Sequence, residues 1–385
     1  MKVLLVGEYS GVHSNLKSIV GNKADVTTIS DGDGYKSYKR DINLSSEYPW
    51  YYRSYMVHVL EFLGLKGLRS FYLDRDIIRE LKGHDVVQLI NTAPISRYGS
   101  LANFLLIRYL KENNKKIFLS AVGDDFTWVS YSLNGSFKYS AMDRLSFRTL
   151  KSYLYSLKYI YGFGYRILDR YVLNSVKAII PGLVDYDIPY RGNTKKTTLI
   201  PLPIKWESYD KAIQLYNEHV SDVMVEKENL IIFHGWQKGK ENRKGNDVFD
   251  DVINSLKDDI DFDYRVVSNV SYDDYLTSFT DSTLFFDQLF SYDMGMNALI
   301  GLANGKIVFS GFEAHSCLDE YPSIHTIGIN ATPDSKQLRK NIELVLRDFN
   351  LRKSIIRNGL EYIIKHHNPA VISDAYLEVW SKNGQ

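Results

Sequence analysis

The stretch "FFDQLFSYDMGMNALIGLANGKIVFSG", residues 285–311, holds the pattern that decides the fold. An apolar strand ends at Asp287, and a glycine-containing loop leads into a helix of small and apolar residues. Gly305 ends that helix before a second apolar strand over 306–310. Two strands joined through a helix run parallel, and a parallel sheet is covered by helices on both faces. The stretch therefore predicts one repeat of a parallel α/β sheet, with Asp287 at the carboxyl end of a strand.

The same alternation of apolar runs and helical stretches extends outward from this stretch, with one polar interruption. We therefore predict two tandem Rossmann-like, doubly wound α/β domains, 1–205 and 229–366, joined by a linker over 206–228. A C-terminal helix over 367–385 follows and can cross back onto the first domain. Because ligands of such sheets bind at the carboxyl ends of the strands, we expect a ligand in the cleft between the domains. The apolar runs lie at 2–7, 25–30, 85–90, 116–123, 177–182, 197–204, 229–235, 263–268, 283–288, 306–311 and 324–329.

The composition is that of a globular protein without a general attraction to nucleic acid. The 385 residues are 44% hydrophobic and 24% charged with a net charge of +1, so we expect a large core and no nucleic-acid partner. The single cysteine, Cys317, excludes an internal disulfide and fits a reducing compartment. The apolar runs are shorter than a secretory signal or a membrane span. We therefore expect a cytoplasmic protein.

A basic loop in the second half predicts an anion site. In "IIFHGWQKGKENRKGNDVFDDVI", residues 231–253, a strand ends at Gly235 and Gly245 opens an amphipathic helix. Backbone N–H groups and the positive dipole end at a helix start bind phosphate oxygens, and nearby cations strengthen that binding. The loop is typical of a diphosphate site, and a plain basic surface loop is the alternative. Four cations lie between the two glycines: Lys238, Lys240, Arg243 and Lys244.

These features together resemble a known enzyme family. The basic loop with Lys-Gly before a helix is followed by an acidic loop and by Ala-X-Gly-Lys-X-Val-X-Ser-Gly at 303–311. This order resembles the carboxyl-terminal half of retaining glycosyltransferases of the GT-B fold, family four. The resemblance is good over about 229–315 and looser elsewhere, at "VGEYSGVHSNL" (6–16) and "TTLIPLPI" (197–204). It implies a GT-B architecture and an enzyme that transfers a sugar with retention of configuration.

The resemblance also implies the ligands. The donor is a nucleotide-diphosphate sugar, with no metal and no bound cofactor, and the acceptor is a glycan or lipid-linked molecule of a bacterial surface polysaccharide such as lipopolysaccharide. Lys244 takes the position that grips the donor diphosphate, with Arg243 as helper and the strand-end Gly235 beside it. Trp236 replaces the family's second basic residue, so Lys238 or Lys240 is its substitute.

The sequence departs from the family at its Glu-X7-Glu pattern, which falls on Tyr292 and Ile300. In that family the first glutamate sits near the donor sugar and the second accepts hydrogen bonds from ribose hydroxyls, as isoleucine cannot. Asp293 and Asp287 are the remaining acids and our candidates for the catalytic, sugar-side carboxylate. An N-cap role is the alternative for Asp293, and a capping or hydrogen-bonding role is the alternative for Asp287.

Three further residues complete the predicted donor side. Gly295 and Asn297 offer backbone and amide N–H groups as hydrogen-bond donors at the start of the helix, where phosphate or sugar hydroxyls bind. Glu313 follows the next strand, in a loop that the resemblance places near the donor.

The first domain supplies the predicted acceptor side. His13 stands at a helix start after "GEYSG", as an acceptor contact or as a polar cap. Asp124 and Asp125 follow another strand, and one of them is a candidate base that orients the acceptor hydroxyl. Two adjacent acids are also ordinary in a turn.

Residues 136–178 have a biased charge, with eight Lys/Arg against two Asp and seven interleaved tyrosines. Such a helix face fits peripheral contact with the inner membrane surface, and a solvated face is the alternative. For the whole chain, a non-catalytic GT-B scaffold that binds a partner transferase or a glycan is the main rival to an enzyme. An oxidoreductase is disfavoured because the Gly-X-G-X-X-Gly fingerprint is absent.

Overall fold

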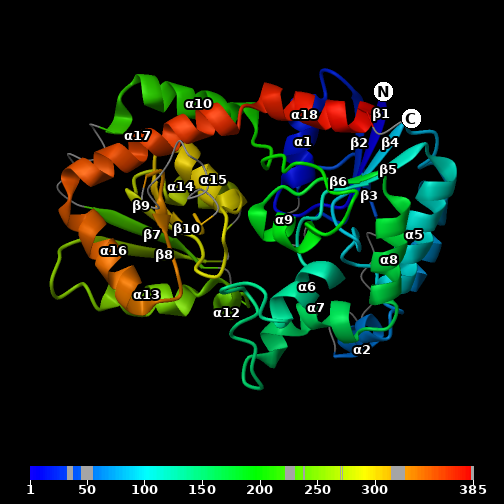
Figure 1. Ribbon diagram of the computed structural model, residues 1–385, viewed down its shortest axis with the longest axis horizontal. Helices are drawn as coiled ribbons and strands as arrows, with labels where there is room; N and C mark the ends of the chain where they lie inside the picture. The colour runs from blue at the N-terminus through cyan, green and yellow to red at the C-terminus, as the bar shows by residue number, and fades with distance from the viewer. Residues whose placement is uncertain are drawn as a thin grey trace. The chain divides into compact units, whose positions relative to one another are not determined.

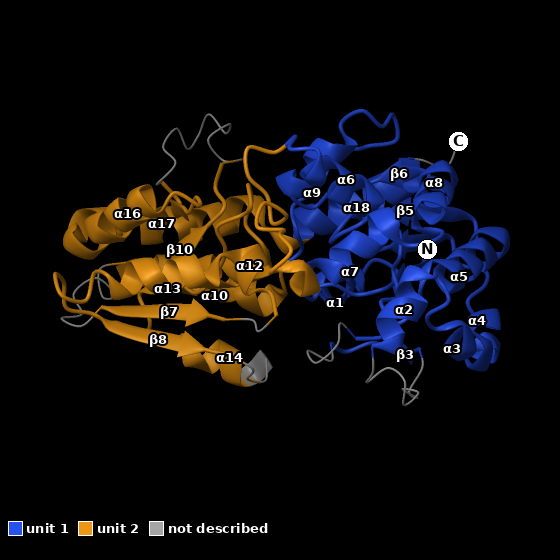
Figure 2. Cartoon of the chain, turned by 90° about the horizontal axis from the view of Figure 1, so that it is seen from below, with its two compact units in different colours: residues 1–136, 153–203, 370–385 blue, residues 137–152, 204–369 orange. Residues whose placement is uncertain are grey.

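The computed structural model describes residues 1–32, 38–44, 55–221, 230–236, 239–268, 270, 272–313 and 326–382. The chain divides into two compact units, coloured separately in Figure 2. Unit 1 comprises residues 1–136, 153–203 and 370–385, and unit 2 comprises residues 137–152 and 204–369. Each unit contains one parallel sheet.

The sheet of unit 1 has the strand order β3-β2-β1-β4-β5-β6. Its centre is β1, whose residues 3–6 are fully buried because helices cover both faces. β1 pairs in parallel with β2 and β4, so their carboxyl ends lie at one edge. The strands are β1 (Lys2–Val6), β2 (Asp25–Ser30), β3 (Ile42–Asn43), β4 (Val86–Leu89), β5 (Lys116–Leu119) and β6 (Ala178–Ile179).

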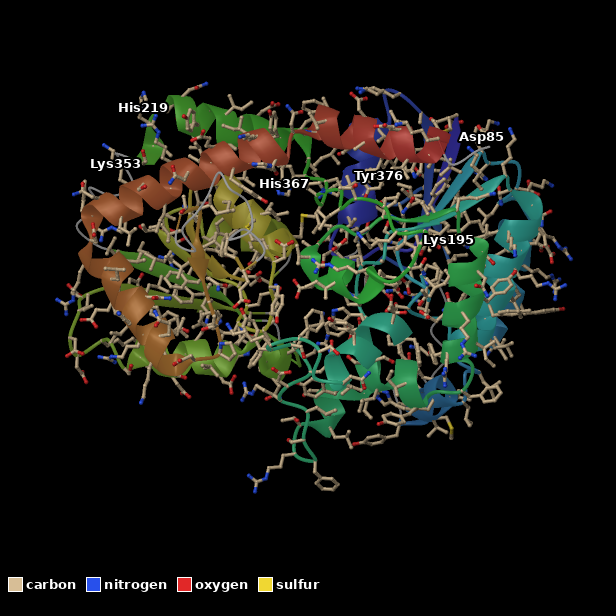
Figure 3. The ribbon with its side chains drawn as sticks, viewed as in Figure 1. Asp85, Lys195, His219, Lys353, His367 and Tyr376 are labelled. Carbon is tan, nitrogen blue, oxygen red and sulfur yellow. The ribbon has the colours of Figure 1, made fainter. Side chains whose placement is uncertain are left out.

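The helices of unit 1 include the end of the chain. α18 returns to this unit, where the indole of Trp380 is fully buried and donates to the side-chain carbonyl of Gln88 in β4 at 2.9 Å. Figure 3 labels Tyr376 on the same helix, and it is also buried. The helices, coloured along the chain in Figure 1, are α1 (Val12–Val20), α2 (Met56–Phe62), α3 (Leu68–Leu73), α4 (Arg75–Arg79), α5 (Ser100–Asn113), α6 (Phe126–Leu133), α7 (Leu150–Tyr161), α8 (Tyr165–Ser175), α9 (Val184–Tyr190) and α18 (Pro369–Lys382).

The sheet of unit 2 has the strand order β11-β10-β9-β7-β8, with every neighbouring pair parallel. The central strands β10, β9 and β7 carry the motifs on which the predicted site depends. Phe233, Phe285, Phe286 and Phe309 are fully buried in this sheet. The strands are β7 (Ile231–Gly235), β8 (Asp263–Val267), β9 (Leu284–Phe286), β10 (Ile307–Ser310) and β11 (Ile329–Asn330).

Amphipathic helices cover the sheet of unit 2. In α13 the buried residues Phe249, Val252 and Ile253 recur at three- and four-residue spacing, which gives one apolar face. α17 runs alongside α10 in Figure 1, and the hydroxyl of Tyr209 in α10 donates to the carbonyl of Ile364. The helices are α10 (Trp206–Asn217), α12 (Glu241–Lys244), α13 (Asn246–Asn254), α14 (Tyr272–Ser278), α15 (Met296–Ala303), α16 (Ser335–Arg347) and α17 (Phe349–His366).

The predicted pair of parallel α/β domains is confirmed, and the structure differs from the sequence-based elements in three places. Residues 137–152 group with unit 2, although the chain on either side belongs to unit 1. The start of the predicted linker is α10 of unit 2. The predicted strand 197–204 does not form: the bridge to Ile179 is made by Lys196, just before it, and Pro201 and Pro203 have no N–H to donate to a ladder. Among the described helices, none has the length and apolar character to cross a bilayer.

Candidate functional site

The basic loop after β7 ends in a turn that favours glycine. α12 ends at Lys244, and Gly245 follows with a φ of 75° as the N-cap of α13. A Cβ on Gly245 would stand 2.6 Å from Cδ1 of Leu289. The N–H of Leu289 donates to the carbonyl of Lys244 at 2.9 Å. The turn therefore places Lys244 against the loop that follows β9.

Lys244 and Asp287, which the sequence suggested from separate motifs, form an ion pair. Nζ of Lys244 lies 2.7 Å from Oδ1 of Asp287, and both side chains are largely buried. The hydroxyl of Ser310 donates to Oδ2 of Asp287 at 3.3 Å. Removing one partner of a buried pair is costly because the other charge stays desolvated. The pair thus ties the end of α12 to the ends of β9 and β10.

α15 begins beside this ion pair. Its N-cap is Gly295, which has no side chain to accept from the first-turn N–H groups. Oδ2 of Asp287 would lie 3.7 Å from a Cβ on Gly295, and Asn297 follows in the first turn of the helix. An ammonium group and a helix start are groups that bind phosphate oxygens. We call Lys244, Asp287, Gly295 and Asn297 the candidate donor site.

Asp293 lies on the loop between β9 and α15. Its Oδ1 accepts from the N–H of Met294 at 2.7 Å, so it is not the N-cap of α15, which is Gly295. The hydroxyl of Ser291 donates to the carbonyl of Asp293 at 2.6 Å. A Cβ on Gly311, just after β10, would lie 2.2 Å from the carbonyl oxygen of Ser291. The loop is therefore held tightly against the end of β10.

Tyr292, where the resemblance predicts the first glutamate, anchors the segment 137–144. Its ring makes edge-to-face contacts with Phe137 and Tyr139 at centroid distances of 5.3 and 5.2 Å. Its hydroxyl accepts from the backbone N–H of Lys138 at 2.5 Å, and Nζ of Lys138 lies 3.3 Å from Oε1 of Glu313. Tyr292 therefore has a packing role at a position where a carboxylate was expected, and Glu313 lies beside the same segment. Sequence reasoning missed this contact.

The second glutamate position is apolar in its contacts as well as in its type. Ile300 is buried in α15, among the residues that pack this helix on the sheet. An isoleucine there adds to the core of unit 2 and offers no acceptor to a ribose hydroxyl.

The remaining cations of the basic loop differ in their surroundings. Nη1 of Arg243 lies 3.7 Å from the sulfur of Met142. Arg144 makes a bidentate ion pair, at 2.5 and 2.6 Å, with Asp247 in the first turn of α13, and this hydrogen bonding lowers the pKa of Asp247. The start of α13 therefore carries its own carboxylate. Lys238 lies outside the described residues.

A buried hydrogen-bond chain fixes β7 to α13. The hydroxyl of Tyr264 donates to Asp250 at 2.9 Å and accepts from Nδ1–H of His234 at 2.7 Å, while Nε2 of His234 accepts from the amide of Asn246 at 2.8 Å. Burial, and to a lesser extent the charge of Lys244, lowers the pKa of His234 to about 3. The imidazole of His234 is therefore neutral at pH 7, as the hydrogen bond accepted by its Nε2 requires. In the sequence, His234 directly follows the apolar residues 231–233, which was the one signal that its side chain would be buried.

In unit 1, His13 holds the first βα loop. Its Nδ1 lies 2.8 Å from the carbonyl oxygen of Gly7, and burial lowers its pKa to about 3. The carboxylate of Glu8 accepts from the N–H groups of His13 and Ser14 at 3.3 and 2.8 Å, at the start of α1. A neutral, buried His13 is thus placed to orient the loop, and the helix start is occupied by Glu8.

Asp124 and Asp125, after β5, have different partners. The hydroxyl of Ser156 in α7 donates to Oδ2 of Asp124, which is buried. Asp125 is the N-cap of α6, where Oδ1 accepts from the N–H of Trp128, and Oδ2 accepts from the hydroxyl of Tyr190 at 2.5 Å. The turn-chemistry alternative is therefore observed for Asp125.

A second buried acid near Asp125 leads to a pH prediction. Burial raises the pKa of Asp125 to about 6, and burial together with the charge of Asp125 raises that of Asp169. Since the folded state holds protons that the unfolded chain releases near pH 4, stability falls as pH rises from about 4 through about 6. Asp169→Asn keeps an acceptor for Thr127, whose hydroxyl lies 3.3 Å away. We expect it to raise the free energy of unfolding at pH 7 by about 1–3 kcal/mol.

Urea titrations of both proteins at pH 5 and pH 7 measure this effect. The gain should be smaller at pH 5 than at pH 7, because the native chain is then closer to full protonation. A gain equal at both pH values would contradict a titrating acid pair.

Comparisons with known proteins bear on the fold. No family model matches the sequence, and no curated protein matches it. Among solved structures, Anabaena Alr3699/HepE in complex with UDP-glucose is similar over 99% of both chains, with a TM-score of 0.56 and 10% identity. WaaG, a glycosyltransferase involved in lipopolysaccharide biosynthesis, is similar over 99% of this chain and 100% of that one, with a TM-score of 0.58 and 13% identity. A glycosyltransferase from Rickettsia africae is similar over 99% of this chain and 98% of that one, with a TM-score of 0.56 and 14% identity.

These matches identify the architecture. Structures that share so little sequence yet align over nearly the whole chain share its fold, which is that of GT-B glycosyltransferases. The predicted GT-B fold is confirmed. A fold hosts several activities, so the function has to be argued from the site.

Proposed function

We propose that this chain is a glycosyltransferase that moves a sugar from a nucleotide-diphosphate donor to a glycan or lipid-linked acceptor, in bacterial surface-polysaccharide synthesis. The observation that carries the proposal is the Lys244–Asp287 ion pair beside the start of α15, whose N-cap is a glycine. It combines a cation and helix N–H groups for phosphate with a carboxylate for sugar hydroxyls. The UDP and UDP-glucose complexes of the similar HepE structures support a nucleotide-sugar donor.

In the proposed reaction the bond from the anomeric carbon to the diphosphate oxygen breaks, and a bond from that carbon to the acceptor oxygen forms. The acceptor's hydroxyl proton leaves with the nucleotide diphosphate. Charge develops on the leaving diphosphate, where Lys244 and the α15 N–H groups stabilise it, so the reaction needs no metal. Lys244 exchanges Asp287 for phosphate, and Asp287 then accepts from the sugar hydroxyls. We propose retention of configuration, following the family resemblance.

The other predicted residues take supporting roles in this proposal. Asp293 lies on the same loop as Asp287, and its carboxylate is a second hydrogen-bond acceptor for the hydroxyl groups of the donor sugar. In unit 1, Asp124 is the candidate residue that orients the acceptor hydroxyl, because it follows β5 at the carboxyl edge of the sheet. His13 orients the loop between β1 and α1. A reducing, cytoplasmic setting fits the single cysteine.

One observation favours a second function, that of a non-catalytic scaffold for a partner transferase or a glycan. Tyr292 and Ile300 replace both family glutamates, and Tyr292 is engaged by Phe137 and Tyr139 instead of facing a ligand hydroxyl. A scaffold of this kind would bind no nucleotide sugar at the candidate donor site.

A donor screen separates the two functions. We expect one nucleotide sugar, with UDP-glucose tested first, to stabilise the protein by about 2.7 kcal/mol at a hundred times its dissociation constant. Thermal unfolding with UDP-, GDP- and ADP-sugars measures this shift, and released nucleotide is assayed with each donor. Absence of both a shift and nucleotide release for every donor would favour the scaffold.

A further inference from the structure

Large apolar side chains gather on the surface of unit 1. Phe163 has 73% of its surface exposed, Tyr161 has 71% and Ile167 has 62%. Single exposed apolar residues are ordinary, whereas a contiguous group marks a contact with another molecule or a membrane. The group, which we call the apolar patch, consists of Leu63, Leu65, Leu101, Tyr161, Phe163 and Ile167.

Backbone hydrogen bonds join the three segments that carry the apolar patch. The N–H of Phe163 donates to the carbonyl of Phe62 at 2.7 Å, which ties the turn between α7 and α8 to the end of α2. The N–H of Leu101 donates to the carbonyl of Gly64 at 3.2 Å, and the hydroxyl of Ser100 donates to the carbonyl of Phe163 at 2.6 Å. These bonds make one surface from segments far apart in sequence, and Figures 1 and 2 both place α2 beside α7.

The segments that carry the apolar patch pack closely against one another at Gly64. A Cβ on Gly64 would lie 2.4 Å from Oγ of Ser100 and 2.8 Å from the carbonyl oxygen of Phe163. The interior beneath is already filled, because Tyr159 and Tyr165, on either side of the turn, are buried.

The charge around the apolar patch is positive. On α8 the exposed residues Arg166, Ile167 and Arg170 share one face, and Arg69, in α3, is exposed four residues after Leu65. Arginine beside exposed aromatic and aliphatic side chains fits the headgroup level of an anionic bilayer.

The cations counted in residues 136–178 do not all contribute to this charge. Lys138 pairs with Glu313 and Arg144 pairs with Asp247, all within unit 2. Lys158 is 4% exposed and pairs with Glu61 at 2.8 Å. The eight cations of residues 136–178 therefore do not share one helix face, and the apolar patch lies on a smaller surface that includes α2 and α5.

We propose that the apolar patch, with its arginine border, docks unit 1 on the anionic surface of a lipid bilayer. The apolar side chains enter the boundary between headgroups and acyl chains while Arg69, Arg166 and Arg170 contact phosphate groups. This extends the proposed function, since a lipid-linked acceptor is presented at such a surface. A protein partner would equally cover apolar side chains, and the arginine border favours lipid.

Vesicle co-sedimentation of the full chain tests the proposal. We expect binding to vesicles of phosphatidylglycerol and phosphatidylcholine in equal parts, and much weaker binding to phosphatidylcholine alone. High salt should release the protein, because the Debye length shortens to about 3 Å at 1 M. Equal binding to both kinds of vesicle, or binding to neither, overturns the proposal.

Two variants and a matched control locate the contact. Phe163→Asp with Ile167→Asp should weaken vesicle binding at least about tenfold, because the buried apolar area is lost. Arg166→Glu with Arg170→Glu should weaken it about fivefold or more per residue, for anionic vesicles only. Val371→Asp is the control, since Val371 is 62% exposed on α18, at the other end of unit 1 from α2 in Figure 1. Thermal unfolding checks that each variant is folded.

The outcomes distinguish this proposal from the proposed function. If the patch variants and the control bind vesicles equally well, the patch is not the docking surface. If light scattering shows a dimer that Phe163→Asp dissociates, a second copy of the chain is the occupant. Donor binding in solution should be unchanged in the patch variants, so a failure of donor binding in the native protein bears on the proposed enzyme alone.

Discussion

Replacing Lys244 by glutamine should lower kcat/KM for the nucleotide-sugar donor by at least about a hundredfold. Removing one preorganised hydrogen-bond donor that stabilises charge in the transition state typically lowers the rate by about this factor. Glutamine is close to lysine in length and can still donate to Asp287, which lies 2.7 Å from Nζ, so the change removes the charge and keeps a contact. Initial rates of nucleotide release at varied donor concentration measure the effect.

The control for this variant is Lys240→Gln. The sequence made Lys240 a candidate for a second basic contact, but the residue is exposed, precedes α12 and is not in the candidate donor site, so its loss should change kcat/KM by less than about threefold. Equal losses for the two variants would mean that the loop acts through its overall positive charge and not through a specific contact between Lys244 and phosphate. Urea unfolding of both separates an effect on chemistry from the destabilisation that follows when Asp287 loses its cation.

A companion change tests the carboxylate. Asp287→Asn keeps the shape and removes the charged acceptor, which should cost about 1.5–3 kcal/mol of donor-sugar binding, or about one to two decades in kcat/KM. If Asp287 serves only to hold Lys244, the double variant should be no worse than Lys244→Gln alone. If it also contacts the sugar, the two losses should add.

Gly311→Ala should inactivate the enzyme while leaving unit 1 folded. The new Cβ would lie 2.2 Å from the carbonyl oxygen of Ser291 and 2.7 Å from the nitrogen of Asp293, which are backbone atoms that cannot rotate away. The loop that leads to α15 must therefore move, and a shift of about 1 Å costs about a hundredfold when it misplaces a reacting group. Nucleotide release and thermal unfolding of unit 2 measure the two effects.

Gly192→Ala is the matched control for this change. A Cβ on Gly192 meets no atom within 4 Å, and its φ lies outside the left-handed region. It should therefore leave activity and unfolding unchanged. Full activity in Gly311→Ala would mean that the loop of Ser291 and Asp293 takes no part in the reaction.

The fold could be predicted because its signals are local. Strands buried on both faces are short apolar runs, so the runs at 229–235, 283–288 and 306–311 contain β7, β9 and β10. Glycine marked the turns: Gly245 and Gly295 are the N-caps of α13 and α15. The failures also have local causes, as at 197–204, where two prolines prevent the expected strand.

The parts of the site that the sequence did not predict depend on distant contacts. Lys244 and Asp287 were both chosen as ligand residues, yet their pairing depends on how two βα loops meet, 43 residues apart. The contact of Tyr292 with Lys138 spans 154 residues and has no periodicity to indicate it. The same holds for Lys158, whose burial against Glu61 cannot be seen in a tyrosine-rich, basic helix. Charge and spacing reveal what a residue can do, and tertiary contacts decide what it does.

The return of α18 to unit 1 determines when that unit can be completed during synthesis. Trp380 lies in a core cluster with Val3, Leu5 and Phe118, so the core around β1 is complete only after α18 has been synthesised. Unit 2 is translated in between and has its own sheet, so it is free to fold first. Nascent unit 1 would meanwhile expose apolar surface, which makes it a natural client for chaperones, and truncating the final helix should give an insoluble product.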